Sequence, residues 1–200
     1  EINSRLGLSF RYCWTSSPKY GIVRKAVITN TGSSNVKAKI LDGCRNILPA
    51  AIFQGLQNDN SVLIDAYKKS DLDEKTNLSL FALSSVVSDK AEPCECLIAN
   101  TCWFSTDDEV SLNPDAPDEF AENGTASKIS VLKGKRGAAF IQRTVDLKAN
   151  ERDGWYQVFD TYLDASRIAE LRNLISDKKN AVKELEKDID DGQKLMETYI

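Results

Sequence analysis

The chain has 200 residues, a formal net charge of −4 and no histidine, with 42% hydrophobic and 28% charged residues. Its length and composition are typical of one globular domain, or of a domain with an appendage. The acidic balance argues against nucleic-acid binding, and no apolar run approaches the ~20 residues of a membrane span. Because typical acid–base and nucleophilic enzymes rely on histidine, we expect a non-catalytic module with no catalytic residue, no metal and no cofactor.

Residues 6–15 place Leu6, Leu8, Phe10, Tyr12 and Trp14 on one face, which predicts a half-buried strand. A second strand is predicted over Gly21–Thr29 and a third over Val36–Leu41. The turn-forming cluster that begins at Asn30 lies between them, so we expect a hairpin.

The middle of the chain is less regular. Asp42-Gly43 is expected to end the third strand, and Cys44–Gln57 then reads as a buried loop or a short helical turn. Val62–Lys69 fits either a strand or a helix. Leu78–Val87 is apolar on both faces and predicts a central strand, and Cys94–Phe104 predicts another strand beyond Pro93.

Residues 105–124 hold seven acidic residues and no basic one, which predicts a solvated loop with at most a helical turn. Calcium binding is an alternative, but the acids lack the spacing of a calcium-binding loop. Strands are predicted over Ser127–Leu132 and Gly137–Leu147. The basic residues 133–137 between them do not match the sequence pattern of a phosphate-binding loop, so we expect the tip of a hairpin there. Gly154–Phe159 is a short aromatic segment.

The apolar period changes to that of a helix after Asp164 or Ser166, either of which can cap the helix start. We expect one helix to about Tyr199, with an intramolecular two-helix hairpin and an intermolecular coiled coil as alternatives. Lys178 interrupts its apolar column. We therefore expect the first half of the helix to pack on the sandwich, and the second half to dock on a downstream domain or, in its absence, on a neighbouring copy. The column contains Ile168, Leu171, Ile175, Val182, Leu185, Ile189 and Met196.

The cysteine count is odd, so at least one thiol is free. We expect all five to be reduced and to pack as small hydrophobic side chains, with a disulfide or a metal site as the alternatives. Reduced thiols favour a cytoplasmic location without excluding the periplasm. The cysteines are Cys13, Cys44, Cys94, Cys96 and Cys102.

Four side chains are candidates for ligand binding. Trp14 and Trp103 lie near strand ends, where aromatic rings can stack on sugars, although tryptophan there is also common as a core or rim residue. Arg45 and Asn46 lie in a mixed polar and apolar segment. They could bind a ligand or satisfy backbone groups of a buried loop.

Three motifs resemble the N-terminal region of large bacterial proteins that are similar to cellobiose phosphorylases and related glycoside hydrolases. The resemblance implies an antiparallel "supersandwich" of galactose-mutarotase-like shape, then a helical linker and a catalytic (α/α)₆ barrel that lies beyond this chain. No catalytic residue of that family carries over to these positions. The motifs are Thr15-Ser16-Ser17-Pro18-Lys19-Tyr20-Gly21-Ile22-Val23-Arg24, Ile28-Thr29-Asn30-Thr31-Gly32 and Asp42-Gly43-Cys44-Arg45-Asn46-Ile47-Leu48-Pro49.

Together these observations predict a mainly β chain, with an antiparallel β-sandwich over residues 1–160 and a helical linker over 161–200. Because Glu1 begins the chain and Met196 is its only methionine, we expect a piece of a longer protein. The expected role is a non-catalytic domain of a carbohydrate-active enzyme, shaping the sugar site or an interface. The alternative is a protein-interaction module without sugar binding. The expected partners are the downstream catalytic domain, carbohydrate and a second copy in a homodimer, with no nucleic acid and no membrane.

Overall fold

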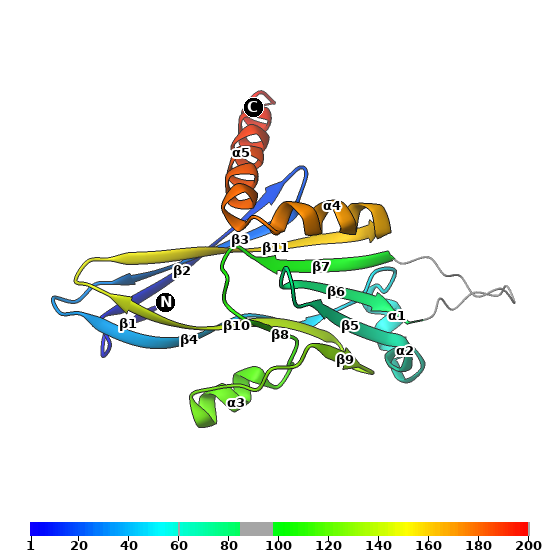
Figure 1. Ribbon diagram of the computed structural model, residues 1–200, viewed down its shortest axis with the longest axis horizontal. Helices are drawn as coiled ribbons and strands as arrows, with labels where there is room; N and C mark the ends of the chain where they lie inside the picture. Colours follow the sequence, from blue (N-terminus) through cyan, green and yellow to red (C-terminus); the bar gives the residue numbers. More distant parts are fainter. Residues whose placement is uncertain (60, 85–97, 200) are drawn as a thin grey trace, which may run out of the picture.

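The computed structural model describes residues 1–59, 61–84 and 98–199. Two antiparallel sheets are stacked, and two C-terminal helices cover the outer face of the longer sheet (Figure 1). The predicted fold class, an antiparallel β-sandwich followed by a C-terminal helical segment, is confirmed. Within the described residues, no helix is long and apolar enough to cross a membrane.

The first sheet, called here the long sheet, is 8-stranded. Within the described residues, its strands pair antiparallel. In spatial order its strands are β1 (Ile2–Asn3), β2 (Leu8–Ser17), β3 (Gly21–Asn30), β11 (Arg152–Asp164), β7 (Ile98–Phe104), β6 (Leu78–Leu83), β5 (Lys68–Asp73) and β9 (Val131–Lys133).

The second sheet, the short sheet, is 3-stranded. Its strands in order are β4 (Val36–Ile47), β10 (Gly137–Leu147) and β8 (Val110–Ser111). The helices are α1 (Gln54–Asp59), α2 (Ser61–Tyr67), α3 (Ala116–Asn123), α4 (Ala165–Ile175) and α5 (Lys178–Glu197).

The long sheet buries apolar side chains on both faces. Its inner face packs against the short sheet around Phe81, Phe104 and Trp155. Its outer face packs against α4 and α5 around Trp103 and Val158. The molecule therefore has three layers, in the order helices, long sheet and short sheet (Figure 1).

The predicted hairpin of Gly21–Thr29 and Val36–Leu41 is wrong. β3 pairs with β2 and β11, whereas β4 pairs with β10 in the other sheet. The chain between them crosses from one sheet to the other, and the Asn30 side chain anchors this crossing by donating to the carbonyl oxygens of Ser34 and Leu147. A turn cluster marks a change of direction, but it does not say which strand follows in the sheet.

Asp42-Gly43 does not end the third strand, because β4 continues to Ile47. A Cβ at Gly43 would lie 2.1 Å from the carbonyl oxygen of Ala139 on β10, so the glycine permits a close approach of the two strands. The predicted loop over Cys44–Gln57 is therefore wrong at its start, and its later part contains the first turn of α1.

The acidic segment also holds more structure than predicted. The helix α3 covers Ala116–Asn123, with a proline in its first turn and Gly124 in a left-handed conformation after its end. Asp118 and Glu119 lie in its first turn, where their negative charges interact favourably with the positive end of the helix dipole.

The alternation of β2 places Phe10, Tyr12 and Trp14 on the inner face, but this face is only partly covered. Tyr12 is 51% and Trp14 is 55% exposed. The short sheet has fewer strands than the long sheet and has β4 at its edge. We attribute the exposure of these two rings to that difference in width.

The predicted single helix from Asp164 to Tyr199 is two helices. The Asp164 side chain caps α4 by accepting a hydrogen bond from the Arg167 amide, as predicted for that residue. A second cap at Asp177 accepts from the Asn180 amide and starts α5. Figure 1 shows the two helices at a steep angle instead of lying antiparallel as a hairpin.

The predicted division of packing at Lys178 is also wrong. Leu185 on α5 is fully buried and Ile189 is 8% exposed, in the same cluster as Leu171 of α4. The Lys178 side chain lies inward, where its Nζ donates to the carbonyl oxygens of Phe104 at 2.9 Å and Thr76 at 3.1 Å. These hydrogen bonds offset the cost of burying a charged side chain, so Lys178 can occupy a position in the apolar column. Whether residues 161–200 lead to another domain stays a prediction.

Three of the five cysteines lie in the described part of the chain, and these three are free thiols. Cys102 is buried and Cys44 is half-buried, as expected for small hydrophobic side chains. The same expectation is wrong for Cys13, which is exposed on β2. Cys94 and Cys96 lie outside the described residues.

Candidate functional site

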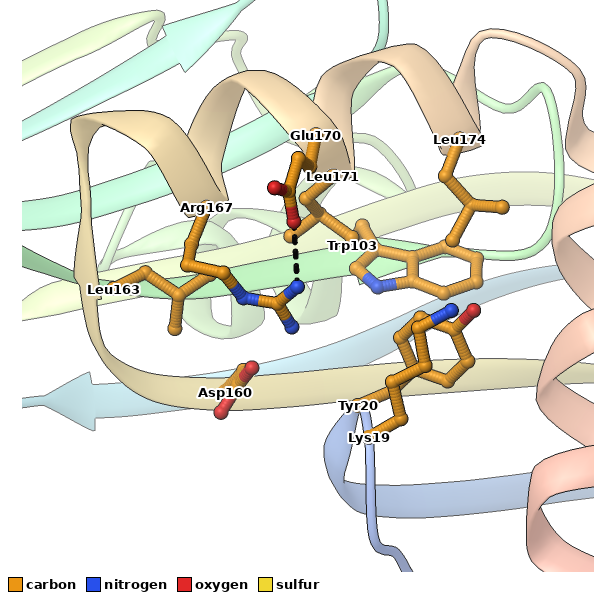
Figure 2. A pocket seen from close by; sticks show the side chains of 9 residues that line it. All are labelled: Lys19, Tyr20, Trp103, Asp160, Leu163, Arg167, Glu170, Leu171 and Leu174. Carbon is orange, nitrogen blue, oxygen red and sulfur yellow. Dashed lines mark hydrogen bonds and ion pairs between the residues drawn. The ribbon is translucent and has the colours of Figure 1, made fainter.

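A cavity of about 100 Å³ lies on the outer side of the long sheet, beneath the first turns of α4 (Figure 2). It is enclosed by α4, by the end of β11, by β7 and by the turn between β2 and β3. The lining side chains are Lys19, Tyr20, Trp103, Asp160, Leu163, Arg167, Glu170, Leu171 and Leu174. We call this cavity the α4 pocket.

Buried aromatic and aliphatic groups form the floor of the α4 pocket. Trp103 is 1% exposed and Tyr20 is 5% exposed. Trp103 faces outward from β7 because alternate residues of a strand point to opposite faces, while its neighbour Phe104 packs in the inner core. The Lys178 ammonium, at the start of α5, lies 5.4 Å from the centroid of the Trp103 ring and makes a cation–π contact with it.

Charged groups of both signs form the rim. On α4, Arg167 Nη1 and Glu170 Oε2 lie 2.6 Å apart, one helical turn from each other. Asp160 comes from β11, and Lys19 comes from the turn, with its Nζ 5.1 Å from the Tyr20 ring centroid. The rim therefore offers both hydrogen-bond donors and carboxylate acceptors around an apolar floor.

The indole nitrogen of Trp103 is the most informative polar group of the α4 pocket. Figure 2 shows it facing the space between Arg167 and Tyr20. Among the residues drawn there, it has no hydrogen-bond acceptor. The hydroxyl of Tyr20, which also lines the pocket, is buried and has no hydrogen-bond partner within the described residues, so the pocket contains an unpaired polar group that a ligand can satisfy.

Such an arrangement can bind a small molecule that carries both hydroxyl groups and an apolar face. Carboxylates at Asp160 and Glu170 can accept hydrogen bonds from hydroxyl groups, and Arg167 and Trp103 can donate to their oxygens. A cavity of this volume is small for a ligand site, so it suits one ring in preference to a chain.

The other tryptophan candidate lies elsewhere. Trp14 is on the inner face of the long sheet, whereas Trp103 is on the outer face, so the sheet separates them. The Trp14 ring stacks on Phe159, with centroids 6.3 Å apart and an interplanar angle of 26°. The Arg24 guanidinium lies 6.0 Å from its centroid.

Arg45 and Asn46 lie near the end of β4 and are not part of the α4 pocket. Both are exposed, and Arg45 Nη1 lies 3.8 Å from Asp118 Oδ2 on α3. Asn46 has a φ of 65°, a left-handed conformation that asparagine tolerates. Of the four candidates, the structure therefore places only Trp103 in the pocket.

Sequence reasoning missed most of the α4 pocket. The spacing of Arg167 and Glu170 is typical of a helical ion pair, which usually has only a surface role. Lys19 lies in a turn and Asp160 lies on a strand, and nothing local connects either residue to a helix that follows later in the chain.

Comparisons with known proteins add no relative. No model of a known protein family matches the sequence, and a search of curated proteins finds no match. The geometry of the α4 pocket and the motifs of the sequence are therefore the basis for a functional proposal.

Proposed function

We propose that this chain is a non-catalytic β-sandwich domain of a larger carbohydrate-active enzyme, a glycoside phosphorylase or a glycoside hydrolase. In this proposal the domain helps to shape a sugar site or an interface, and the catalytic residues lie in another part of the parent protein. The motifs that resemble the N-terminal region of such enzymes suggest the class. A cytoplasmic location is part of the proposal.

The observation that carries the proposal is the composition of the α4 pocket. Sugars present hydroxyl groups that donate and accept hydrogen bonds, together with an apolar C–H surface. The α4 pocket combines an aromatic floor at Trp103 and Tyr20 with acidic and basic groups at its rim. The buried Tyr20 hydroxyl, which has no hydrogen-bond partner within the described residues, adds a polar group in a dry environment, where a hydrogen bond discriminates between ligands.

The exposed ring of Trp14 offers a second contact for sugar, on the opposite face of the sheet. Its exposure suits stacking on a sugar ring. It lacks the surrounding carboxylates of the α4 pocket, so we assign it no specificity.

The proposal is tested by titrating the purified chain with glucose, cellobiose and maltose, followed by calorimetry and by saturation-transfer NMR. Trp103→Phe removes the indole N–H and keeps an aromatic ring, so it should weaken binding about two- to tenfold, as expected for one neutral hydrogen bond. Tyr199→Phe is the control, because it removes one hydrogen-bonding group at an exposed position outside the α4 pocket and should leave binding unchanged.

Absence of binding by all three sugars at millimolar concentration would contradict sugar recognition by this domain. It would favour the alternative, a protein-interaction module. That alternative has its own supporting observation at the end of α5, where Leu195, Met196 and Tyr199 are 55%, 67% and 79% exposed.

A further inference from the structure

One end of the α4 pocket holds two neighbouring groups that both offer protons. The Tyr20 hydroxyl is buried and has no hydrogen-bond partner in the described part of the chain. The Lys19 ammonium lies 5.1 Å from the Tyr20 ring centroid, and Figure 2 shows it beside the hydroxyl. The nearby Tyr20 side chain raises the pKa of Lys19, with a smaller contribution from Glu184 on α5. The amine is therefore charged at neutral pH.

The turn that carries these two groups is fixed by α5. The Asp188 carboxylate accepts hydrogen bonds from the Ser17 hydroxyl and from the Lys19 amide, the second at 3.0 Å. The Ser17 hydroxyl oxygen in turn accepts a hydrogen bond from the Tyr20 amide at 3.0 Å. Because these bonds hold the backbone of the turn, the Tyr20 side chain and the base of the Lys19 side chain are in place before a ligand binds.

The opposite end of the pocket depends on a bulge in β11. The register of β11 on β7 shifts between Asp160 and Leu163, and Tyr162 has a φ of 59° there. The Tyr162 amide donates to Asn100 Oδ1 at 3.1 Å, which holds the bulge in place. Regular alternation would place Asp160 and Leu163 on opposite faces of the sheet. The bulge instead lets both side chains line the pocket.

We propose that the ligand of the α4 pocket is a hexuronate, a six-membered sugar ring whose carboxylate binds at Lys19 and Tyr20. The inference rests on the proposed function, because it takes the ligand to be a sugar and specifies its charge. In this pose the Tyr20 hydroxyl donates to the carboxylate, and the Lys19 ammonium forms an ion pair with it. The ring lies against Trp103. Hydroxyl groups on its far side donate to Asp160 and accept from Arg167.

The negative charge of the ligand follows from how the pocket's own charges are placed. Among the described residues that line it, the carboxylates are Asp160 and Glu170, and Figure 2 shows both near Arg167, away from the Lys19 end. Arg167 and Glu170 already pair with each other at 2.6 Å. A ligand carboxylate is an acceptor for both proton-bearing groups of the other end, and such charge-assisted bonds are strong. An amino sugar bound there would place a second cation beside Lys19.

Ligands with a six-membered ring and different charges test the carboxylate. Glucose, glucuronate, glucosamine and cyclohexanecarboxylate are titrated separately into the full chain at low ionic strength, followed by calorimetry and saturation-transfer NMR. Glucuronate should bind about tenfold more tightly than glucose, as expected for a charge-assisted hydrogen bond. Its affinity should fall as salt is added, because salt screens an ion pair with the exposed Lys19.

Lys19→Met tests the ion pair, because it removes the ammonium and keeps an unbranched side chain. The affinity for glucuronate should fall to about that for glucose, whereas the affinity for glucose should stay the same. Lys37→Met is the matched control. It changes the net charge by the same amount at an exposed position on β4, outside the pocket, and should leave both affinities unchanged.

Tyr20→Phe tests the buried hydroxyl. It removes only a group that has no hydrogen-bond partner within the described residues, so the variant should fold normally. Glucuronate binding should weaken about two- to tenfold. Unchanged glucuronate binding in both Lys19→Met and Tyr20→Phe would overturn the assigned place of the carboxylate.

A further ligand distinguishes a free hexuronate from the end of an acidic polysaccharide. A disaccharide with glucuronate at its non-reducing end should bind more tightly than glucuronate if the pocket takes a chain end, and more weakly if it takes the free acid. Either order supports a hexuronate in the pocket, provided that Lys19→Met weakens the tighter of the two.

The remaining outcomes separate this inference from the proposed function. Equal binding of glucose and glucuronate, with no effect of Lys19→Met, would overturn the hexuronate and leave a sugar-binding domain. Tighter binding of glucosamine than of glucuronate would overturn the assigned charge alone. Cyclohexanecarboxylate binding as tightly as glucuronate would overturn both proposals, since the hydroxyl groups would then play no part in recognition.

Discussion

Arg24 of β3 and Asp42 of β4 form a buried ion pair that joins the two sheets, with 2.6 Å between Nη2 and Oδ2. The same carboxylate oxygen accepts a hydrogen bond from the indole N–H of Trp155, 2.7 Å away on β11. Arg24 and Asp42 are 4% and 5% exposed. Because a buried charge is tolerated only when it is paired, this contact favours a particular register of β4 over the long sheet.

Asp42→Ala is expected to lower the free energy of unfolding by about 3–5 kcal/mol, because it leaves the Arg24 guanidinium buried without its partner. Urea denaturation followed by tryptophan fluorescence measures this change. Lys69→Ala is the control, since it removes one partner of a partly exposed pair with Asp71 and should cost about 1 kcal/mol or less. Equal losses in the two variants would contradict a structural role for the buried pair.

Leu171→Ala and Ile189→Ala are each expected to cost about 2–5 kcal/mol, since both side chains are 8% exposed and share one apolar cluster. Leu195→Ala is the matched control near the end of α5 and should change stability by about 0.5 kcal/mol or less. Thermal unfolding of the three variants makes the comparison. A loss at Leu171 without a loss at Ile189 would show that α5 does not dock as described.

Lys178 should make stability depend on pH under alkaline conditions. Burial lowers its pKa from 10.5 to about 8, an effect that Asp107 partly opposes. Between these two values the unfolded chain keeps a proton that the folded chain has lost, so the free energy of unfolding rises with pH. This contribution of Lys178 to the pH dependence of stability is absent well below pH 8 and ends near pH 10.5.

The measurement compares the chain with Lys178→Met by urea denaturation at pH 7.0, 8.5 and 10.0. Other titrating groups are common to both proteins, so the difference between the two reports Lys178. We expect the difference to move in favour of the unmodified chain as pH rises. A constant difference across this range would contradict the lowered pKa.

The three described thiols should react at very different rates. Cys13 is exposed, whereas burial raises the pKa of Cys44 and raises that of Cys102 strongly. Since the thiolate is the reactive form, iodoacetamide should label Cys13 first and Cys102 only after unfolding. Peptide mass spectrometry at successive times identifies the order. Early labelling of Cys102 in the folded chain would contradict its burial.

The sequence alone determined the type of most elements. Period-two alternation predicted strands at β2 and β4, because one face of each is more apolar than the other. Strands were also predicted at β3, from its β-branched residues, and at β10. The change to helical period after Asp164 predicted the C-terminal helices, and the cap at Asp164 was found because capping is a local interaction. These features depend on residues that are close in the sequence, so the sequence alone is enough to predict them.

Only the tertiary structure decided which strands are neighbours and which candidates meet. The turn after Asn30 is compatible with a hairpin or a crossing, and the bonds from its side chain to the chain near Leu147 made it a crossing. Trp103 lies in the α4 pocket because α4 folds back over β7, while Trp14, on a similar strand pattern, remains more than half exposed. The alternation of apolar and polar residues indicates that the two faces of a strand differ. The number of strands in the opposing sheet decides how much of the apolar face is covered.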